Sequence, residues 1–213
     1  MSLGYSEEKS DDALYQQYLH GDTASYDELM IRYGDRLTFY LYGYLHDYPD
    51  AEDMMIEAFA RIMAKRPKIG EGAFKAYLFK TARNLALRHH ERKSRLQVFS
   101  IDGLDGELAD IVLATGTAVS GSEGFRNVPA GLSNPVEDDF GHEERKRILH
   151  LCLNRIEPEL KEALWLIYFE DMSYNQAASV MKVSSKRIDH LLQRGKRQMR
   201  IELAKEGMTN AYA

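Results

Sequence analysis

The sequence contains one cysteine and only five prolines among its 213 residues. A single cysteine cannot form an internal disulfide, so no disulfide framework supports the fold. Cys152 lies in the apolar run of residues 148–153, and this setting favours a buried structural thiol over a catalytic nucleophile. No stretch of about 18 uncharged apolar residues is present, and the N-terminus lacks the basic-then-apolar order of a secretory signal. We therefore expect a cytoplasmic protein with no membrane insertion.

Motifs of the common enzyme classes are also absent from the sequence. It has no glycine-rich phosphate loop, no histidine or cysteine set at metal-binding spacing, and no serine or cysteine nucleophile motif. His89 and His90 are neighbours, but no second ligand pair accompanies them. We therefore expect no enzymatic activity, no catalytic residues, no cofactor and no metal.

Basic residues are scarce in the first 60 positions and are concentrated in two later blocks. The net charge of -5 conceals these blocks, which occupy residues 61–95 and residues 182–205. Two separated basic blocks indicate two contacts with a polyanion such as nucleic acid. For either block alone, an ordinary solvated helix face is the alternative interpretation.

A third kind of sequence separates the two basic blocks. Residues 96–141 are rich in Gly, Ser, Asp and Ala, contain Pro129 and Pro135, and have Arg126 as their only basic residue. They show no sustained helical periodicity. A structureless stretch of this length is uncommon inside one compact domain. We therefore predict a long, flexible, acidic linker that joins two domains, residues 11–95 and residues 142–206.

The first domain shows the spacing of amphipathic helices. Apolar residues recur every three or four positions through residues 13–45, with an interruption at Gly21 that separates two helices. Pro49 predicts the start of another helix, because proline is tolerated in a first turn and the acidic residues after it suit the positive end of the helix dipole. That helix should end before Pro67, and residues 73–95 should form a further helix. No alternating β-type run competes, so we predict an all-α fold.

The second domain begins with two predicted helices. Residues 143–155 form one helical pattern, and Pro158 starts the next. Apolar spacing in the second of these helices predicts four residues that face inward, which are Ala163, Leu164, Ile167 and Tyr168.

A helix-turn-helix pattern follows in the second domain. Ser173 and Gln176 have capping-box spacing, which predicts a short helix over residues 174–181. A tight turn at residues 182–183 and a serine cap then lead into a long basic helix, residues 185–205. A short helix, a brief turn and a basic helix are typical of helix-turn-helix proteins, in which the second helix fits the major groove of DNA.

These segments together resemble the extracytoplasmic-function family of RNA polymerase sigma factors. Residues 49–53 followed by residues 57–59 resemble the acidic helix of sigma region 2. Residues 74–86 are similar to the segment that captures the melted minus-10 element. Residues 170–184 and the helix after them resemble sigma region 4, which reads the minus-35 element. The resemblance covers roughly residues 11–95 and 143–203, and it depends on all the pieces occurring in this order and separation.

The resemblance implies both a fold and a function. The fold would be a region 2 helical bundle and a region 4 helix-turn-helix. The function would be to direct core RNA polymerase to specific promoters and to assist promoter melting, so the partners would be core polymerase, promoter DNA and an anti-sigma factor. The alternative is a stand-alone helix-turn-helix transcriptional regulator that does not bind core polymerase. That alternative leaves the acidic helix and residues 74–95 without a role.

The resemblance also implies the residues of three binding surfaces. The surface for core polymerase would be Asp50, Glu52, Asp53, Ile56 and Glu57. The surface for the minus-10 element would be Tyr77, Lys80, Arg83, Asn84 and Arg88. The surface for the minus-35 element would be Ser185, Lys186, Arg187, His190, Arg194, Lys196 and Arg197.

Each surface has a chemical rationale and a structural alternative. Acidic residues at the start of a helix can bind a basic partner, but they also stabilise the helix dipole. Asn84 can hydrogen-bond an unstacked base, while arginines hold phosphates. Phe74 and Tyr77 fit the apolar stripe of their helix, so we favour the core over base stacking for both. In the last helix, Ser185 to His190 should approach base edges and the later basic residues should hold phosphates, with a solvated helix end as the alternative.

Overall fold

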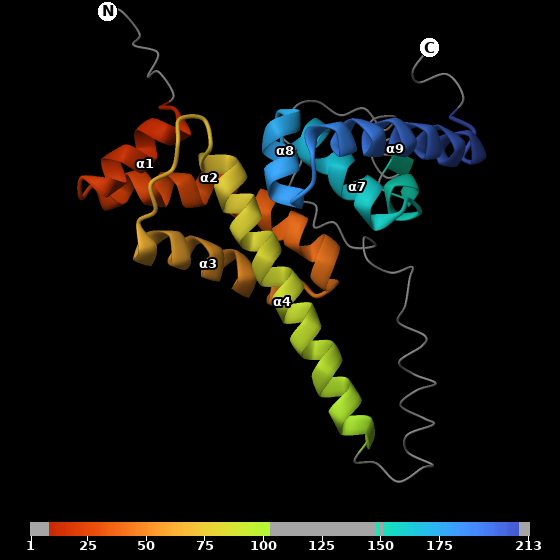
Figure 1. Ribbon diagram of the computed structural model, residues 1–213, viewed down its shortest axis with the longest axis horizontal. Coiled ribbons are helices and arrows are strands. Elements are labelled where there is room, and N and C mark those ends of the chain that lie inside the picture. The colour runs from red at the N-terminus through yellow and green to blue at the C-terminus, as the bar shows by residue number, and fades with distance from the viewer. Residues whose placement is uncertain (1–8, 103–147, 150, 209–213) are drawn as a thin grey trace, which may run out of the picture. The chain divides into compact units, whose positions relative to one another are not determined.

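The computed structural model describes residues 9–102, 148–149 and 151–208 (Figure 1). Most of the predicted linker, residues 96–141, lies outside this part of the chain. The chain divides into two compact units, Met1–Arg92 and Lys93–Ala213, and the division falls within helix α4. All regular elements in the described residues are helical, which confirms the predicted all-α fold.

Unit 1 is built from α1 (Asp11–Leu19), α2 (Thr23–Leu45), α3 (Tyr48–Lys65) and the first part of α4 (Phe74–Asp102). Each of the first three helices starts at a local side-chain cap. The caps are Ser10, Asp22 and Asp47, whose side-chain oxygens accept from backbone N–H groups in the first turn. The predicted break near Gly21 and the predicted helix start near Pro49 are both confirmed.

Helix α4 is longer than the sequence analysis predicts. It runs through Asp102, whereas the prediction ended the helix at residue 95 and began the linker at residue 96. Residues 96–102 contain neither glycine nor proline, and Gly103 is the first helix-breaking residue after them. The chain therefore has no local reason to leave the helix where the basic block ends.

Tyrosine side chains form much of the core of unit 1. Tyr15, Tyr18 and Tyr26 are almost fully buried. Their hydroxyls donate to backbone carbonyls in the second half of α3 and just beyond it, with Oη–O distances of 2.8 Å to Pro67, 2.9 Å to Met63 and 2.6 Å to Phe59. The Met63 carbonyl lies in the last turn of α3, where carbonyls have no partner within the helix. The tyrosines of α1 and α2 therefore fix the C-terminal end of α3 as well as fill the core.

Aromatic contacts also attach α4 to α2. Phe79 lies 5.1 Å from Tyr40 between ring centroids, and Phe74 lies 6.3 Å from Tyr33. Phe74 and Phe79 are both buried, so this side of α4 faces the core. The rotation of α4 about its axis is thereby set, and its opposite side is presented outward.

Unit 2 contains the predicted helix-turn-helix. Helix α7 (Pro158–Leu164) continues into the π-helix η3 (Trp165–Phe169), and α8 (Tyr174–Met181) and α9 (Ser185–Lys205) follow. Both hydrogen bonds of the predicted capping box at Ser173 are present, and Ser184 caps α9. Lys182 ends α8 in the left-handed region, with φ 58°. The predicted bounds of both helices are confirmed.

The inward set predicted for the helix that starts at Pro158 is only partly correct. Ala163 and Leu164 are buried, but the side chain of Tyr168 is exposed and Ile167 is only half-buried. The reason is η3, because a π-helical turn contains an additional residue and shifts the later side chains around the helix axis.

Cys152 is buried, as expected of a structural thiol, and burial raises the pKa of its thiol. Residues 148–149 and 151–154 are helical, in the part of the predicted helix 143–155 that the structure describes.

None of the helices described has the length and apolar character needed to cross a membrane.

Candidate nucleic-acid and protein interfaces

The five residues predicted to bind polymerase lie on α3, and three of them are clearly exposed. Glu52, Asp53 and Ile56 are exposed, and Ile56 keeps 50% of its accessible surface. The opposite side of α3 is held in the core by Ala51, Ala58, Phe59 and Ile62. An acidic surface with an exposed isoleucine therefore projects from the bundle.

The other two predicted residues of this surface already have partners within the protein. The Glu57 carboxylate accepts from Arg61 Nη2 at 2.5 Å, one turn along α3. The Asp50 carboxylate lies 3.9 Å from Nε2 of His89 on α4. The helix cap is Asp47, outside the predicted set, and only Asp50 of that set lies in the first turn, where the helix dipole acts. Glu52 and Asp53 lie beyond that turn.

One exposed apolar residue extends this surface beyond the predicted set. Met63 keeps 44% of its accessible surface, two turns after Ile56 on α3. Residues at this spacing lie on the same side of a helix. The residue before it, Ile62, is buried and fills the core position at this turn of the helix.

The predicted minus-10 residues lie along one side of α4. Arg88 is exposed, and Lys80, Arg83 and Asn84 are half-buried. Tyr77 keeps 36% of its accessible surface, whereas Phe74 keeps 1%. The core interpretation is therefore confirmed for Phe74 and wrong for Tyr77, which lies beside the buried stripe rather than within it.

A tyrosine that the sequence analysis did not identify holds Arg83. The Arg83 Nε donates to the Tyr44 hydroxyl at 3.1 Å, and the guanidinium carbon lies 6.0 Å from the Tyr44 ring centroid. Tyr44 packs edge-on against Tyr40, which is buried against Phe79. A continuous set of aromatic contacts thus joins the core to the guanidinium and restricts its position.

The seven predicted minus-35 residues lie on α9, whose buried side packs against α7. Ile188, Leu191, Leu192 and Gly195 are buried. A Cβ atom at Gly195 would lie 3.1 Å from Leu164 Cδ1, so glycine allows the two helices to approach closely. With this side fixed, Lys186, His190 and Arg197 are exposed. Ser185 Oγ donates to Asn175 Oδ1 at 2.6 Å and joins the N-termini of α8 and α9.

The two edges of the exposed side of α9 differ in chemistry. On one edge, Arg187 and Arg194 form ion pairs with Glu159 and Glu157 at 2.8 Å and 3.1 Å. On the other edge, Lys196 Nζ lies 5.2 Å from the ring centroid of the exposed Tyr168. A hydrogen bond with Tyr168 raises the pKa of Lys196. All seven predicted residues belong to one helix, and some are neutralised or covered by neighbours.

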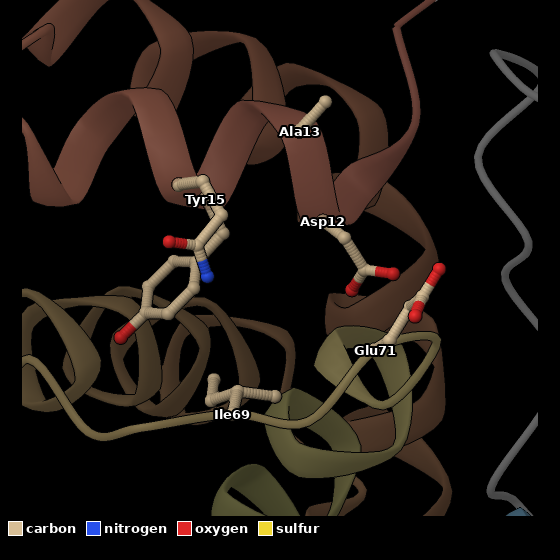
Figure 2. Close-up of a pocket in the computed structure, with 6 residues that line it drawn as sticks. Asp12, Ala13, Tyr15, Ile69 and Glu71 are labelled. Atoms are coloured by element: carbon tan, nitrogen blue, oxygen red, sulfur yellow. The ribbon is translucent and has the colours of Figure 1, made fainter.

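Unit 1 also contains a shallow hollow that none of the predicted residues lines. It has a volume of about 260 Å³ and lies between α1 and the loop before α4. Figure 2 shows the carboxylates of Asp12 and Glu71 at its edge and the ring of Tyr15 beside Ile69. Asp12 accepts from the backbone N–H of Gly72 and so ties the loop to α1. This hollow does not have the positive charge that a nucleic-acid site needs.

Comparison with known families assigns both units. Residues 29–96 match the family described as Sigma-70 region 2, and residues 146–199 match the family described as Sigma-70, region 4. Together the two matches span more than half of the chain. The first includes all predicted polymerase and minus-10 residues, and the second includes all predicted minus-35 residues.

Individual relatives agree with these family matches. The chain is 26% identical over 197 residues to the ECF RNA polymerase sigma factor SigE of Mycolicibacterium smegmatis, covering 91% of this chain and 68% of the relative. It is 22% identical over 176 residues to the RNA polymerase sigma-H factor of Pseudomonas aeruginosa, covering 82% of this chain and 84% of the relative.

A solved structure shares the fold. The sigma factor RpoE from Bartonella quintana, crystallised with the anti-sigma factor NepR, aligns with a TM-score of 0.58 and 18% identity, covering 84% of this chain and 96% of that chain.

Proposed function

The chain belongs to the extracytoplasmic-function class of RNA polymerase sigma factors, and from this membership we propose how its surfaces divide the work of promoter recognition. Sigma factors are DNA-binding regulators that direct core polymerase to promoters. The exposed acidic side of α3 is the surface we assign to core polymerase. Glu52 and Asp53 provide negative charge for a basic partner, and Ile56 and Met63 provide apolar contact area beside it.

We assign the exposed side of α4 to the displaced promoter strand. Asn84 has a donor and an acceptor for the edge of an unstacked base, and the half-exposed ring of Tyr77 offers a stacking surface. Arg83 and Arg88 supply positive charge for the phosphates of the same strand. The contact between Arg83 and Tyr44 supports this assignment, because an arginine held in place loses less conformational freedom when a phosphate binds.

We assign the exposed side of α9 to the minus-35 element. The single observation that carries this proposal is the geometry of α8 and α9: a capped short helix, a left-handed turn residue, and a capped basic helix with one buried side. In this arrangement the first turns of the second helix enter the major groove. Lys186 and His190 would meet base edges, and Arg194 and Arg197 would meet phosphates.

An anti-sigma factor is the regulatory partner we propose. The structural neighbour from Bartonella quintana was crystallised with an anti-sigma factor. For this chain, such a partner would compete with polymerase near Asp53 and Glu57 and with DNA near Lys186 and Arg187. Bound partner protein in extracts of unstressed cells, displaced when the chain is active, is the expected result. Full activity of the chain taken from those cells with nothing bound would contradict this part of the proposal.

Polymerase binding by α3 variants tests the division of surfaces. We expect Glu52→Lys with Asp53→Lys to abolish comigration with core polymerase on a sizing column, because the charge of the exposed surface is reversed. The matched control is Asp27→Lys with Glu28→Lys, which makes the same charge change on exposed residues at the start of α2. Equal loss from both pairs, or no loss from the α3 pair, would contradict the assignment. A stand-alone regulator would not comigrate with polymerase in any form.

A further inference from the structure

Two arginines of the proposed recognition helix are already neutralised within unit 2. Arg187 Nη2 lies 2.8 Å from Glu159 Oε2, and Arg194 Nη2 lies 3.1 Å from Glu157 Oε2. The two arginines are seven positions apart, so they lie two turns apart on one edge of α9. Both glutamates come from the start of α7, where Glu157 precedes the helix and Glu159 lies in its first turn. The start of α7 therefore places a pair of carboxylates along the basic edge of α9.

We propose that Glu157 and Glu159 act as internal counterions that limit the affinity of α9 for duplex DNA. This inference rests on the proposed function of α9. It assigns an affinity-limiting role to two acidic residues outside the helix-turn-helix. Their effect would be to weaken binding to any DNA sequence while leaving the base-reading positions near Lys186 and His190 unchanged.

The two ion pairs are exposed, so DNA phosphates can compete with the glutamates for the arginines. The four side chains keep between 43% and 54% of their accessible surface, so a phosphate can approach each guanidinium. Exposed ion pairs contribute little to folding stability. They have a larger effect on the binding of a charged ligand. An arginine that is already paired with a carboxylate releases fewer counterions from DNA, and that carboxylate repels the phosphate. Free binding to duplex DNA is then weak, and polymerase must supply the remaining affinity.

The local structure permits a clean test of this idea. The Glu157 side chain makes no capping hydrogen bond to α7, so its replacement by glutamine removes charge without removing a cap. Glu206 provides a matched control, because its carboxylate forms an ion pair of 2.6 Å with Arg155. Arg155 belongs to neither α8 nor α9. Glu206→Gln thus makes the same change in net charge as either single substitution and removes the shorter of the two ion pairs that Arg155 forms, with Glu206 and Glu202, away from the proposed recognition surface.

The experiment measures binding of the full chain to a short fluorescent duplex of random sequence over a range of salt concentrations. We expect Glu157→Gln with Glu159→Gln to raise the affinity at low salt by about threefold for each glutamate. The slope of log affinity against log salt should steepen by about one for each freed arginine. Glu206→Gln should change neither quantity, and Arg187→Ala with Arg194→Ala should lower both. Circular dichroism checks that every variant retains its helicity.

Three outcomes would count against the proposal in different ways. An unchanged affinity and slope in the Glu157 and Glu159 variant, with weaker binding in the arginine variant, would overturn the inference and leave the assignment of α9 standing. A rise in Glu206→Gln equal to the rise per glutamate in the double variant would show an effect of net charge alone and would also overturn it. If the arginine variant binds DNA as well as the wild type, α9 does not contact DNA through this edge, and the proposed function of that surface fails as well.

Discussion

Replacement of Tyr44 by phenylalanine tests the contact that holds Arg83 on the promoter-facing side of α4. The substitution removes the hydroxyl that accepts from Arg83 Nε at 3.1 Å and that lies 3.4 Å from the Tyr40 hydroxyl, and it keeps the ring that packs edge-on against Tyr40 at 5.5 Å. The fold should therefore be retained. Without the hydroxyl, the guanidinium samples more rotamers and must be ordered when the displaced strand binds.

The size of the effect follows from the kind of hydrogen bond that is lost. A hydrogen bond with a charged donor contributes about 1.5–3 kcal/mol when it is well buried. Arg83 and Tyr44 are both half-buried, so we expect the loss to be about 1 kcal/mol, since water competes for both groups. That corresponds to about a fivefold lower rate of open-complex formation. Binding to core polymerase should not change, because α3 carries that surface.

The assay compares open-complex formation by holoenzyme reconstituted with the wild type, Tyr44→Phe, Arg83→Ala and the double variant. If Tyr44 acts through Arg83, its substitution has no further effect once Arg83 is alanine. Tyr42→Phe is the control. Tyr42 lies on the same helix as Tyr44, but its half-buried ring lies beside His46. Additive losses in the double variant, or a normal rate in Tyr44→Phe, would refute the positioning role.

Three further predictions concern single residues in the two units. Asn84→Ala should leave helicity and polymerase binding intact and reduce open-complex formation on duplex promoters; a variant that fails to fold would instead make Asn84 structural. Lys182→Gly should raise the free energy of unfolding of unit 2 by about 0.5–1 kcal/mol, because Lys182 has a φ of 58° that costs a side-chain-bearing residue energy; a lower unfolding temperature would contradict this. Burial lowers the pKa of Lys161 to about 8. The unfolded chain therefore binds more protons than the folded chain between about pH 8 and pH 10.4, so stability should rise with pH in that window. In urea titrations Lys161→Met should lack this rise, and an identical pH dependence in the variant would contradict the assignment.

The sequence predicts the helix boundaries well because the signals for them are local. Ser173, Gln176 and Ser184 determine the starts of α8 and α9 through contacts that span three residues. Pro49 likewise indicates the start of α3 within one turn. The positions of the candidate residues on α3, α4 and α9 follow from these boundaries. Whether they bind polymerase and promoter DNA as assigned stays a prediction.

Features that depend on distant contacts were not predicted. The contact between Arg83 and Tyr44 joins residues 39 positions apart, and the pair of Arg194 and Glu157 joins residues 37 positions apart. Periodicity carries no information about such pairs, because either partner alone resembles an ordinary surface residue.

Errors of helical spacing have another cause. The inward position predicted for Tyr168 assumes an uninterrupted α-helix, and the π-helix at that point changes the spacing. The prediction of a core position for Tyr77 is wrong for a different reason: the residue lies one position from the buried stripe of α4, and apolar spacing alone does not separate the two positions.

Run-off transcription tests the central claim most directly. Core RNA polymerase is incubated with the purified chain on fragments of the source genome, and the transcripts are mapped at their 5′ ends. We predict discrete start sites that require both components and share upstream elements at constant spacing, and the variant with Glu52→Lys and Asp53→Lys should give none of them. The same transcripts from polymerase without the chain, or tight sequence-specific binding by the chain with no transcript in any mixture, would contradict the account.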